Sequence, residues 1–141
     1  MHNSYDPEID TLIDNVVQFG SHYHLEQMDT LYTADQSILF LSGDRTVTRV
    51  PRDVMMAEFA SRGAAGEPPL STERRTLHVE QQGDQATAIL YRRMSASAPP
   101  VVYELRLRKE KGRWQVAGET VMAWPRPEDA DDFLPPRTTV D

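Results

Sequence analysis

The stretch GDQATAILYRRM, residues 83–94, decides how the second half of this chain folds. Its first two residues, Gly83 and Asp84, are typical of a tight turn between two strands. The residues after them alternate in character, and in a strand every second side chain points to the same face. The alternation therefore predicts a strand with one face built from Ala86, Ala88, Leu90, Arg92 and Met94.

Arg92 is the unexpected member of this face, because its neighbours belong in a hydrophobic core. Burying an isolated charge costs several kcal/mol, so the guanidinium needs an anion or an internal partner. Glu119, on the last predicted strand, is the natural internal candidate. We interpret the face as the wall of a pocket, where Arg92 offers its planar fork to a carboxylate or enolate. Two alternatives stay open: a structural Arg92–Glu119 pair at the rim, and a bulge or register slip that turns Arg92 to solvent.

Helices are predicted mainly in the first half of the chain. Asp6 can cap the first helix and Pro7 suits its first turn, after which apolar residues recur at helical spacing. A third helix opens at a proline and ends at a glycine. The predicted ranges are 7–20, about 25–33 and 51–63 for helices, and 37–42 and 46–50 for two short strands.

Four further strands are predicted from residue 74 onward, over residues 75–81, 85–95, 101–109 and 113–124. Two tight turns and one Pro-Pro loop join them into a twisted antiparallel sheet. Helices first and strands later are typical of an α+β fold. We predict a single α+β domain over residues 1–124, with three N-terminal helices packed in the concave face of a strongly curved, mostly antiparallel sheet. A Pro-rich acidic tail occupies residues 125–141.

Composition favours a soluble globular protein and excludes several classes of function. No apolar run approaches the ~18 residues that a membrane span needs, and the N-terminus lacks the pattern of a secretory signal. The net charge of -7 argues against a nucleic-acid partner, which requires a basic face. The absence of cysteine fits a cytoplasmic location. Phosphate-binding and dinucleotide-binding glycine motifs are absent, so no cofactor is expected.

The order of these elements is similar to that of a known superfamily. Together with LYTAD at 31–35, GDQA at 83–86 and GRWQV at 112–116, it resembles the nuclear transport factor two-like superfamily. That superfamily includes SnoaL-like polyketide cyclases and ketosteroid isomerases. The resemblance extends over about residues 7–124. It implies a cone-shaped fold with an apolar cavity at its open end, and a homodimer formed through the convex face of the sheet.

Only some of the catalytic residues of the ketosteroid isomerases have counterparts in this sequence. In an alignment on residues 32–35, Phe40 occupies the position of their general-base aspartate, and Val16 that of their oxyanion-binding tyrosine. Tyr103 stands where those enzymes keep a protonated aspartic acid, and a phenol can also donate to a developing oxyanion. Because the base has no replacement at its own position, a ketosteroid-type isomerase is not expected.

Asp35 and the histidines are the other groups that could carry chemistry. Asp35 either caps a turn before the 37–42 strand or reaches the mouth of the cavity as a base. His22 and His24 have no evident third ligand, so we interpret them as an exposed helix end rather than a metal site. His78 is expected on a strand as a packing or surface residue rather than as an acid–base group.

The sequence supports two hypotheses for function and does not decide whether the protein is an enzyme. In the first, a SnoaL-like pocket binds a small apolar molecule that carries a carboxylate or enolate, and any reaction is a cofactor-free isomerisation, cyclisation or dehydration. Arg92 and Tyr103 then stabilise the oxyanion while Asp35 or another mouth group moves the proton. In the second, the chain is a non-catalytic module that dimerises or binds a protein. The other candidate lining residues are Tyr23, Tyr32, Phe40, Met56, Phe59, Leu90 and Glu119.

Overall fold

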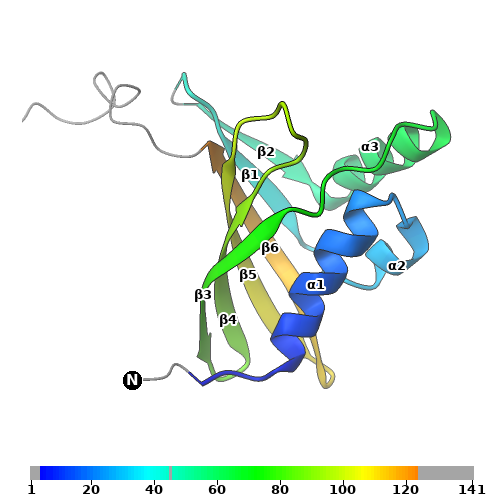
Figure 1. Ribbon diagram of the computed structural model, residues 1–141. Helices are drawn as coiled ribbons and strands as arrows, with labels where there is room; N and C mark the ends of the chain where they lie inside the picture. Colours follow the sequence, from blue (N-terminus) through cyan, green and yellow to red (C-terminus); the bar gives the residue numbers. More distant parts are fainter. Residues whose placement is uncertain (1–3, 45, 124–141) are drawn as a thin grey trace, which may run out of the picture.

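The computed structural model describes residues 4–44 and 46–123 and shows an α+β fold, with helices covering one face of a single sheet (Figure 1). The helices of the described residues are α1 (Glu8–Ser21), α2 (Leu25–Asp29) and α3 (Arg52–Ala64). The strands are β1 (Ser37–Leu41), β2 (Val47–Pro51), β3 (Arg74–Gln82), β4 (Gln85–Arg92), β5 (Val101–Glu110) and β6 (Arg113–Ala123).

The six strands form one mostly antiparallel sheet in the order β2-β1-β6-β5-β4-β3. The exception is the parallel pair of β1 and β6, which joins the first hairpin to the meander formed by β3 to β6. The last described strand therefore lies near the middle of the sheet, between elements far apart in sequence. Side chains on β6 can meet residues from both halves of the chain.

The face that packs against the helices, here called the inner face, takes every second residue of β4. Pairing across β4 and β5 is continuous and places Leu90 opposite Tyr103. The alternation predicted for residues 85–95 is therefore present as far as Arg92, but β4 ends there, so Met94 lies outside the strand. The buried residues of this strand are Ala86, Ala88, Leu90 and Arg92.

A register shift in β6 brings Glu119 to the inner face. Arg106 of β5 pairs with Gly118, whereas the next residue of β5 pairs with Val116, so Ala117 is an extra residue in β6. One extra residue reverses the alternation of a strand. Val116 and Glu119 are consequently both buried on the inner face, although they lie three residues apart.

Helix α1 supplies much of the core beneath the sheet. Its start is fixed by Asp6, whose Oδ1 accepts a hydrogen bond from the Glu8 backbone N–H at 2.9 Å. The other carboxylate oxygen accepts one from Trp114 Nε1 at 3.0 Å, which ties the helix to β6. The apolar residues of α1 recur at helical spacing and are buried: Ile9, Leu12, Ile13, Val16 and Val17.

The second helix is shorter than its sequence pattern predicts. It ends at Asp29, and the next residues run alongside β6 instead of continuing the helix. Val116 donates its backbone N–H to the carbonyl of Leu31, and Thr33 donates to the carbonyl of Val116. Pairing with the sheet thus overrides local helical spacing here.

The predicted tail, residues 125–141, lies outside the described residues, and the domain boundary at 124 stays a prediction.

Leu105→Ala should destabilise the fold far more than Leu77→Ala. Leu105 is 1% exposed on the inner face, so truncation leaves a cavity and should lower the free energy of unfolding by about 2–5 kcal/mol. Leu77 is 46% exposed at the register shift of β3, where the same truncation should cost less than about 1 kcal/mol. Urea unfolding followed by circular dichroism measures both, and equal losses would contradict the assignment of the inner face.

Candidate functional site

Four ionisable side chains from four segments meet on the inner face, and we call them the inner cluster. Arg92 comes from β4, Tyr103 from β5, Glu119 from β6, and Tyr32 from the segment between α2 and β1. Arg92, Glu119 and Tyr32 are buried and Tyr103 is half-buried. Each affects the pKa of others in the group, so they form one electrostatic unit.

The Arg92 guanidinium is held by neutral groups rather than by a carboxylate. Its Nη2 donates hydrogen bonds to the Ser71 carbonyl oxygen at 2.8 Å and to the Ser21 hydroxyl at 3.2 Å. Its Cζ lies 5.8 Å from the centroid of the Tyr103 ring, within the range of a cation–π contact. Among the described residues no carboxylate lies within 4.0 Å of it, and its buried Nε–H has no acceptor.

Glu119 does not form the direct ion pair with Arg92 that the sequence left open. Within residues 4–44 and 46–123, its carboxyl group has no hydrogen bond or ion pair. Burial raises the pKa of Glu119 to about 7, although the charges of Arg92 and Arg106 oppose the rise. The group can therefore take up or release a proton near neutral pH.

The two phenols of the inner cluster stay protonated at neutral pH. Burial is the main cause that raises the pKa of Tyr103 and of Tyr32, and the negative charge of Glu119 adds to it. Neither hydroxyl is hydrogen-bonded to another described residue. The fully enclosed side-chain atoms of the described chain that lack a hydrogen-bond partner are one glutamine oxygen and five arginine nitrogens, one of which, Arg108 Nε, is ion-paired with Glu110. The oxygens of Glu119 and of both phenols are not among them.

The loop that follows α3 is fastened over the end of α1. Two hydrogen bonds hold it there: the Tyr23 hydroxyl donates to the carbonyl of Pro68 at 3.0 Å, and Leu70 donates its N–H to the carbonyl of Ser21 at 2.8 Å. Tyr23 has a positive φ of 58°, and its ring lies 6.2 Å from that of Phe59. The loop therefore covers one end of the inner cluster.

The remaining predicted lining residues differ in how deeply they lie. Leu90 is fully buried beside Tyr103 on the neighbouring strand. Met56 and Phe59 of α3 are half-buried and pack against the same hydrophobic core. Phe40 is 37% exposed on the inner-face side of β1.

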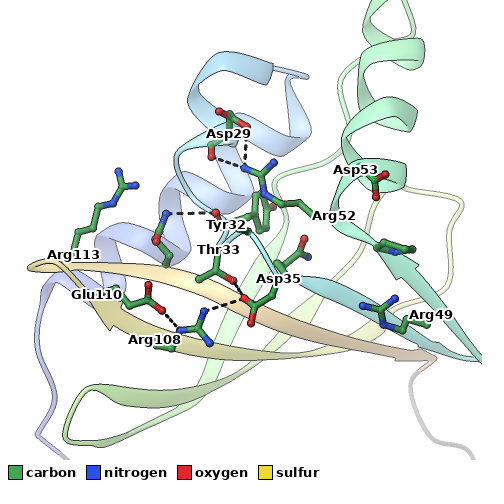
Figure 2. Close-up of a pocket in the computed structure, with 14 residues that line it drawn as sticks. Asp29, Tyr32, Thr33, Asp35, Arg49, Arg52, Asp53, Arg108, Glu110 and Arg113 are labelled. Carbon is green, nitrogen blue, oxygen red and sulfur yellow. Dashed lines mark hydrogen bonds and ion pairs between the residues drawn. The ribbon is translucent and has the colours of Figure 1, made fainter.

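Asp35 lies apart from the inner cluster. Its Oδ1 accepts hydrogen bonds from the Thr33 hydroxyl at 2.7 Å and from Arg108 Nη2 at 2.9 Å, and these contacts lower the pKa of Asp35. The side chain is exposed in a separate cleft (Figure 2). The structure therefore does not bring Asp35 together with Arg92 and Tyr103, and the turn interpretation accounts for its contacts.

This separate space, which we call the outer cleft, has a volume of about 760 Å³. It lies between the segment after α2, the junction of β2 with α3, and the β5–β6 hairpin (Figure 2). Sequence reasoning missed it, because its residues come from three distant segments and form no motif. The lining residues are Asp29, Tyr32, Thr33, Ala34, Asp35, Gln36, Arg49, Pro51, Arg52, Asp53, Arg108, Glu110, Arg113 and Gln115.

The histidines have surface environments. His22 and His24 are exposed, and the Nδ1 of His22 donates to the carbonyl of Gln18 at 2.7 Å. His78 is exposed and lies 3.7 Å from Glu80. In the described part of the chain, no three histidine or acidic side chains gather as metal ligands would, and no helix has the length and apolar character to cross a membrane.

Comparison with known protein families and with curated protein sequences gave no match. Comparison with solved structures gave many matches. An NTF2-like protein of unknown function from Shewanella baltica has 15% identity and a TM-score of 0.69, and the match covers 84% of this chain and 93% of that one. This chain has the NTF2-like fold. A second NTF2-like protein of unknown function, from Silicibacter pomeroyi, has 14% identity and a TM-score of 0.68, covering 83% and 93%.

A third solved structure carries a more specific name. It is a putative calcium/calmodulin-dependent protein kinase type II association domain from Thiobacillus denitrificans, with 17% identity and a TM-score of 0.62. The match covers 89% of this chain and 100% of that domain. At these identities the likeness shows the NTF2-like fold alone.

The free energy of unfolding of the wild-type protein should fall as pH rises from about 4.5 to about 7, and Glu119→Gln should remove this pH dependence. The folded chain keeps the Glu119 proton up to about pH 7, whereas the unfolded chain releases it near its usual 4.5. The unfolded state binds fewer protons in this window, so stability falls as pH rises, by about 3 kcal/mol in total. Urea unfolding at about pH 4 and about pH 8 measures this.

The matched control for this titration is Glu104→Gln, a half-buried carboxylate on the other face of the sheet that is ion-paired with Arg106. The free energy of unfolding of Glu119→Gln relative to wild type should change sharply between about pH 4 and about pH 8. The corresponding difference for Glu104→Gln should change much less. A Glu119→Gln difference that is constant with pH would contradict the burial of an unpartnered carboxyl group.

Proposed function

We propose that the inner cluster binds a small, largely apolar molecule through one oxyanion, a carboxylate or an enolate. Arg92 carries this proposal, because it is a buried cation with no carboxylate within 4.0 Å among the described residues. A ligand oxyanion would supply the missing countercharge through a charge-assisted hydrogen bond. The neighbouring apolar side chains favour a ligand whose other atoms are apolar.

The same arrangement supports acid–base chemistry in the manner of a SnoaL-like pocket. Glu119 can accept a proton from a carbon acid, while Arg92 and Tyr103 stabilise the negative charge that develops on the adjacent oxygen. Cofactor-free isomerases, cyclases and dehydratases need these two tasks. Glu119 thus takes the proton-moving role that sequence reasoning gave to Asp35, since Asp35 lies in the outer cleft.

Arg92→Met should abolish binding of an apolar carboxylate to the inner cluster. With 2-naphthoate as the probe, titration calorimetry should show an affinity at least about tenfold weaker than that of wild type, because one charge-assisted hydrogen bond is lost. Methionine keeps much of the arginine side-chain volume, so the fold should persist. Circular dichroism checks this.

Arg75→Met is the matched control, since Arg75 is exposed on β3 and loses the same charge away from the cluster. Its affinity for 2-naphthoate should equal that of wild type, and neutral 2-naphthylmethanol should bind more weakly than the carboxylate. Equal affinities of the two arginine variants would show that Arg92 is a purely structural clamp between Ser21 and Ser71.

A second candidate function is self-association through the outer face of the sheet, the face opposite the helices. The strand pairings place Leu41, Met122, Val102 and Tyr91 side by side across four strands. All four are only half-buried in the isolated chain. A second copy of this chain would cover such a row. The name of the Thiobacillus denitrificans protein, an association domain, is consistent with this use of the fold.

Val102→Glu should break this self-association without unfolding the chain. It places a carboxylate in the middle of the apolar row, so desolvating it on association would be costly. Light scattering during size exclusion should show a dimer for wild type and a monomer for the variant. Gln82→Glu, which adds a charge at the exposed end of β3, should remain a dimer. A monomeric wild type would exclude this second function.

A further inference from the structure

The outer cleft is lined mainly by polar side chains, and its charged groups are only partly paired. Arg52 is bonded to Asp29 at 2.9 Å. Arg108 forms ion pairs with both Asp35 and Glu110. These contacts hold the walls of the cleft in place and leave little of these charges for a ligand.

Two arginines of the outer cleft remain without such partners. Within the described residues, neither Arg49 nor Arg113 has a carboxylate within 4.0 Å, and both are exposed. Asp53 is the corresponding acid, since no ion pair links it to another described residue. Figure 2 shows Arg49 and Arg113 on opposite sides of the cleft, with Asp53 on the side of Arg49. Two unpaired arginines and one unpaired carboxylate therefore face the outer cleft, although the whole chain has a net charge of -7.

The N-terminus of α3 adds backbone N–H donors to the cleft, although Asp53 in its first turn offsets part of their positive potential. The helix has 13 residues and begins after Pro51 with no side-chain cap. Its first backbone N–H groups therefore have no acceptor from a capping side chain, and a helix N-terminus attracts anions. Pro51, Arg52 and Asp53 line the cleft, so this end of the helix borders it.

Gln36 gives the independent sign that a ligand belongs here. It lines the cleft and is 1% exposed, yet its Oε1 has no hydrogen-bond partner. Its Nε2 meets only the sulfur of Met55 at 3.7 Å, a weak acceptor. Whichever way round the amide is placed, one end is unsatisfied, and a buried polar group in that state destabilises the fold.

We propose that the outer cleft binds a hydroxylated organic anion, of the kind represented by a phosphorylated or carboxylated sugar. The anionic group lies beside Arg49 at the first turn of α3, and a ligand hydroxyl group donates to Gln36 Oε1 once this enclosed amide turns toward the cleft. Arg113 contacts the far end of the ligand. The volume of about 760 Å³ suits a molecule of this size. This site shares neither Arg92 nor Glu119 with the inner cluster, so it stands or falls separately from the function proposed above.

The first test uses glucose 6-phosphate as the probe in titration calorimetry at low ionic strength. Wild type should bind it, inorganic phosphate should bind more weakly, and glucose should not bind measurably. Arg49→Gln should weaken the binding about tenfold or more through the loss of a charge-assisted contact. Arg75→Gln, the matched control on β3, should leave it unchanged. Equal affinities of the two variants, or no binding to wild type, would overturn the proposal.

The second test separates a binding role of Gln36 from a structural one. Gln36→Met removes the unsatisfied buried amide, so it should raise the melting temperature by about 2–4 °C while weakening glucose 6-phosphate binding. A variant that melts lower and binds as wild type does would show that Gln36 serves packing alone. Arg92→Met should bind glucose 6-phosphate normally, and a parallel loss there would assign the binding to the inner cluster instead.

Discussion

A guanidinium buried without a touching carboxylate is the constraint on which this fold and its site both depend. Arg92 is covered by the Ser71 carbonyl, the Ser21 hydroxyl and the ring of Tyr103, all of them uncharged. The first two belong to the loop after α3 and to the end of α1, so the cation fixes the loop over the helix. An apolar side chain of similar size would avoid the desolvation cost. In the proposed function, the arginine anchors an oxyanion at the expense of stability.

The carboxyl group of Glu119, whose pKa Arg92 affects, reaches the inner face through a backbone irregularity. Ala117, the extra residue in β6, lets Val116 fill the core beneath α1 and still turns Glu119 inward. In a regular strand one of the two would face away. The acid then lies close enough to Arg92 for its pKa to be affected, but not close enough to be neutralised by an ion pair. That intermediate separation allows a carboxyl group to titrate near pH 7 inside the protein.

Local periodicity accounts for the features that the sequence could predict, and little beyond them was predictable. The face of β4 that contains Arg92 was predictable because this strand is regular over its whole length. The partners of Arg92 were not, because Ser21 and Ser71 are brought to it by the path of the chain rather than by any spacing. The early end of α2 has a similar cause, since the segment after it pairs with β6. Glu119 was a correct candidate for the inner face, although nothing in the sequence marks Ala117 as a bulge.

Non-local assembly also explains why the sequence left the position of Asp35 open and why the outer cleft went unnoticed. Asp35 precedes β1, and from the sequence alone it could lie at either end of the sheet. Its actual partner, Arg108, comes from the β5–β6 hairpin, 73 residues away. The arginines around the cleft are dispersed in the same manner. A site formed by three segments is visible only once the sheet order is known.

Tyr32 is the side chain at which the two sites meet. It lines the outer cleft, yet the pKa of its hydroxyl is affected by Glu119, Tyr103 and Arg92 of the inner cluster and by Arg52 of the cleft. Charges on both sides therefore act on one buried phenol, and a substitution of Tyr32 would alter both places at once. Arg92 belongs to the inner cluster alone, and Arg49 lines only the cleft. Two functions in so small a domain can be separated only through residues that, like these, contact one site and not the other.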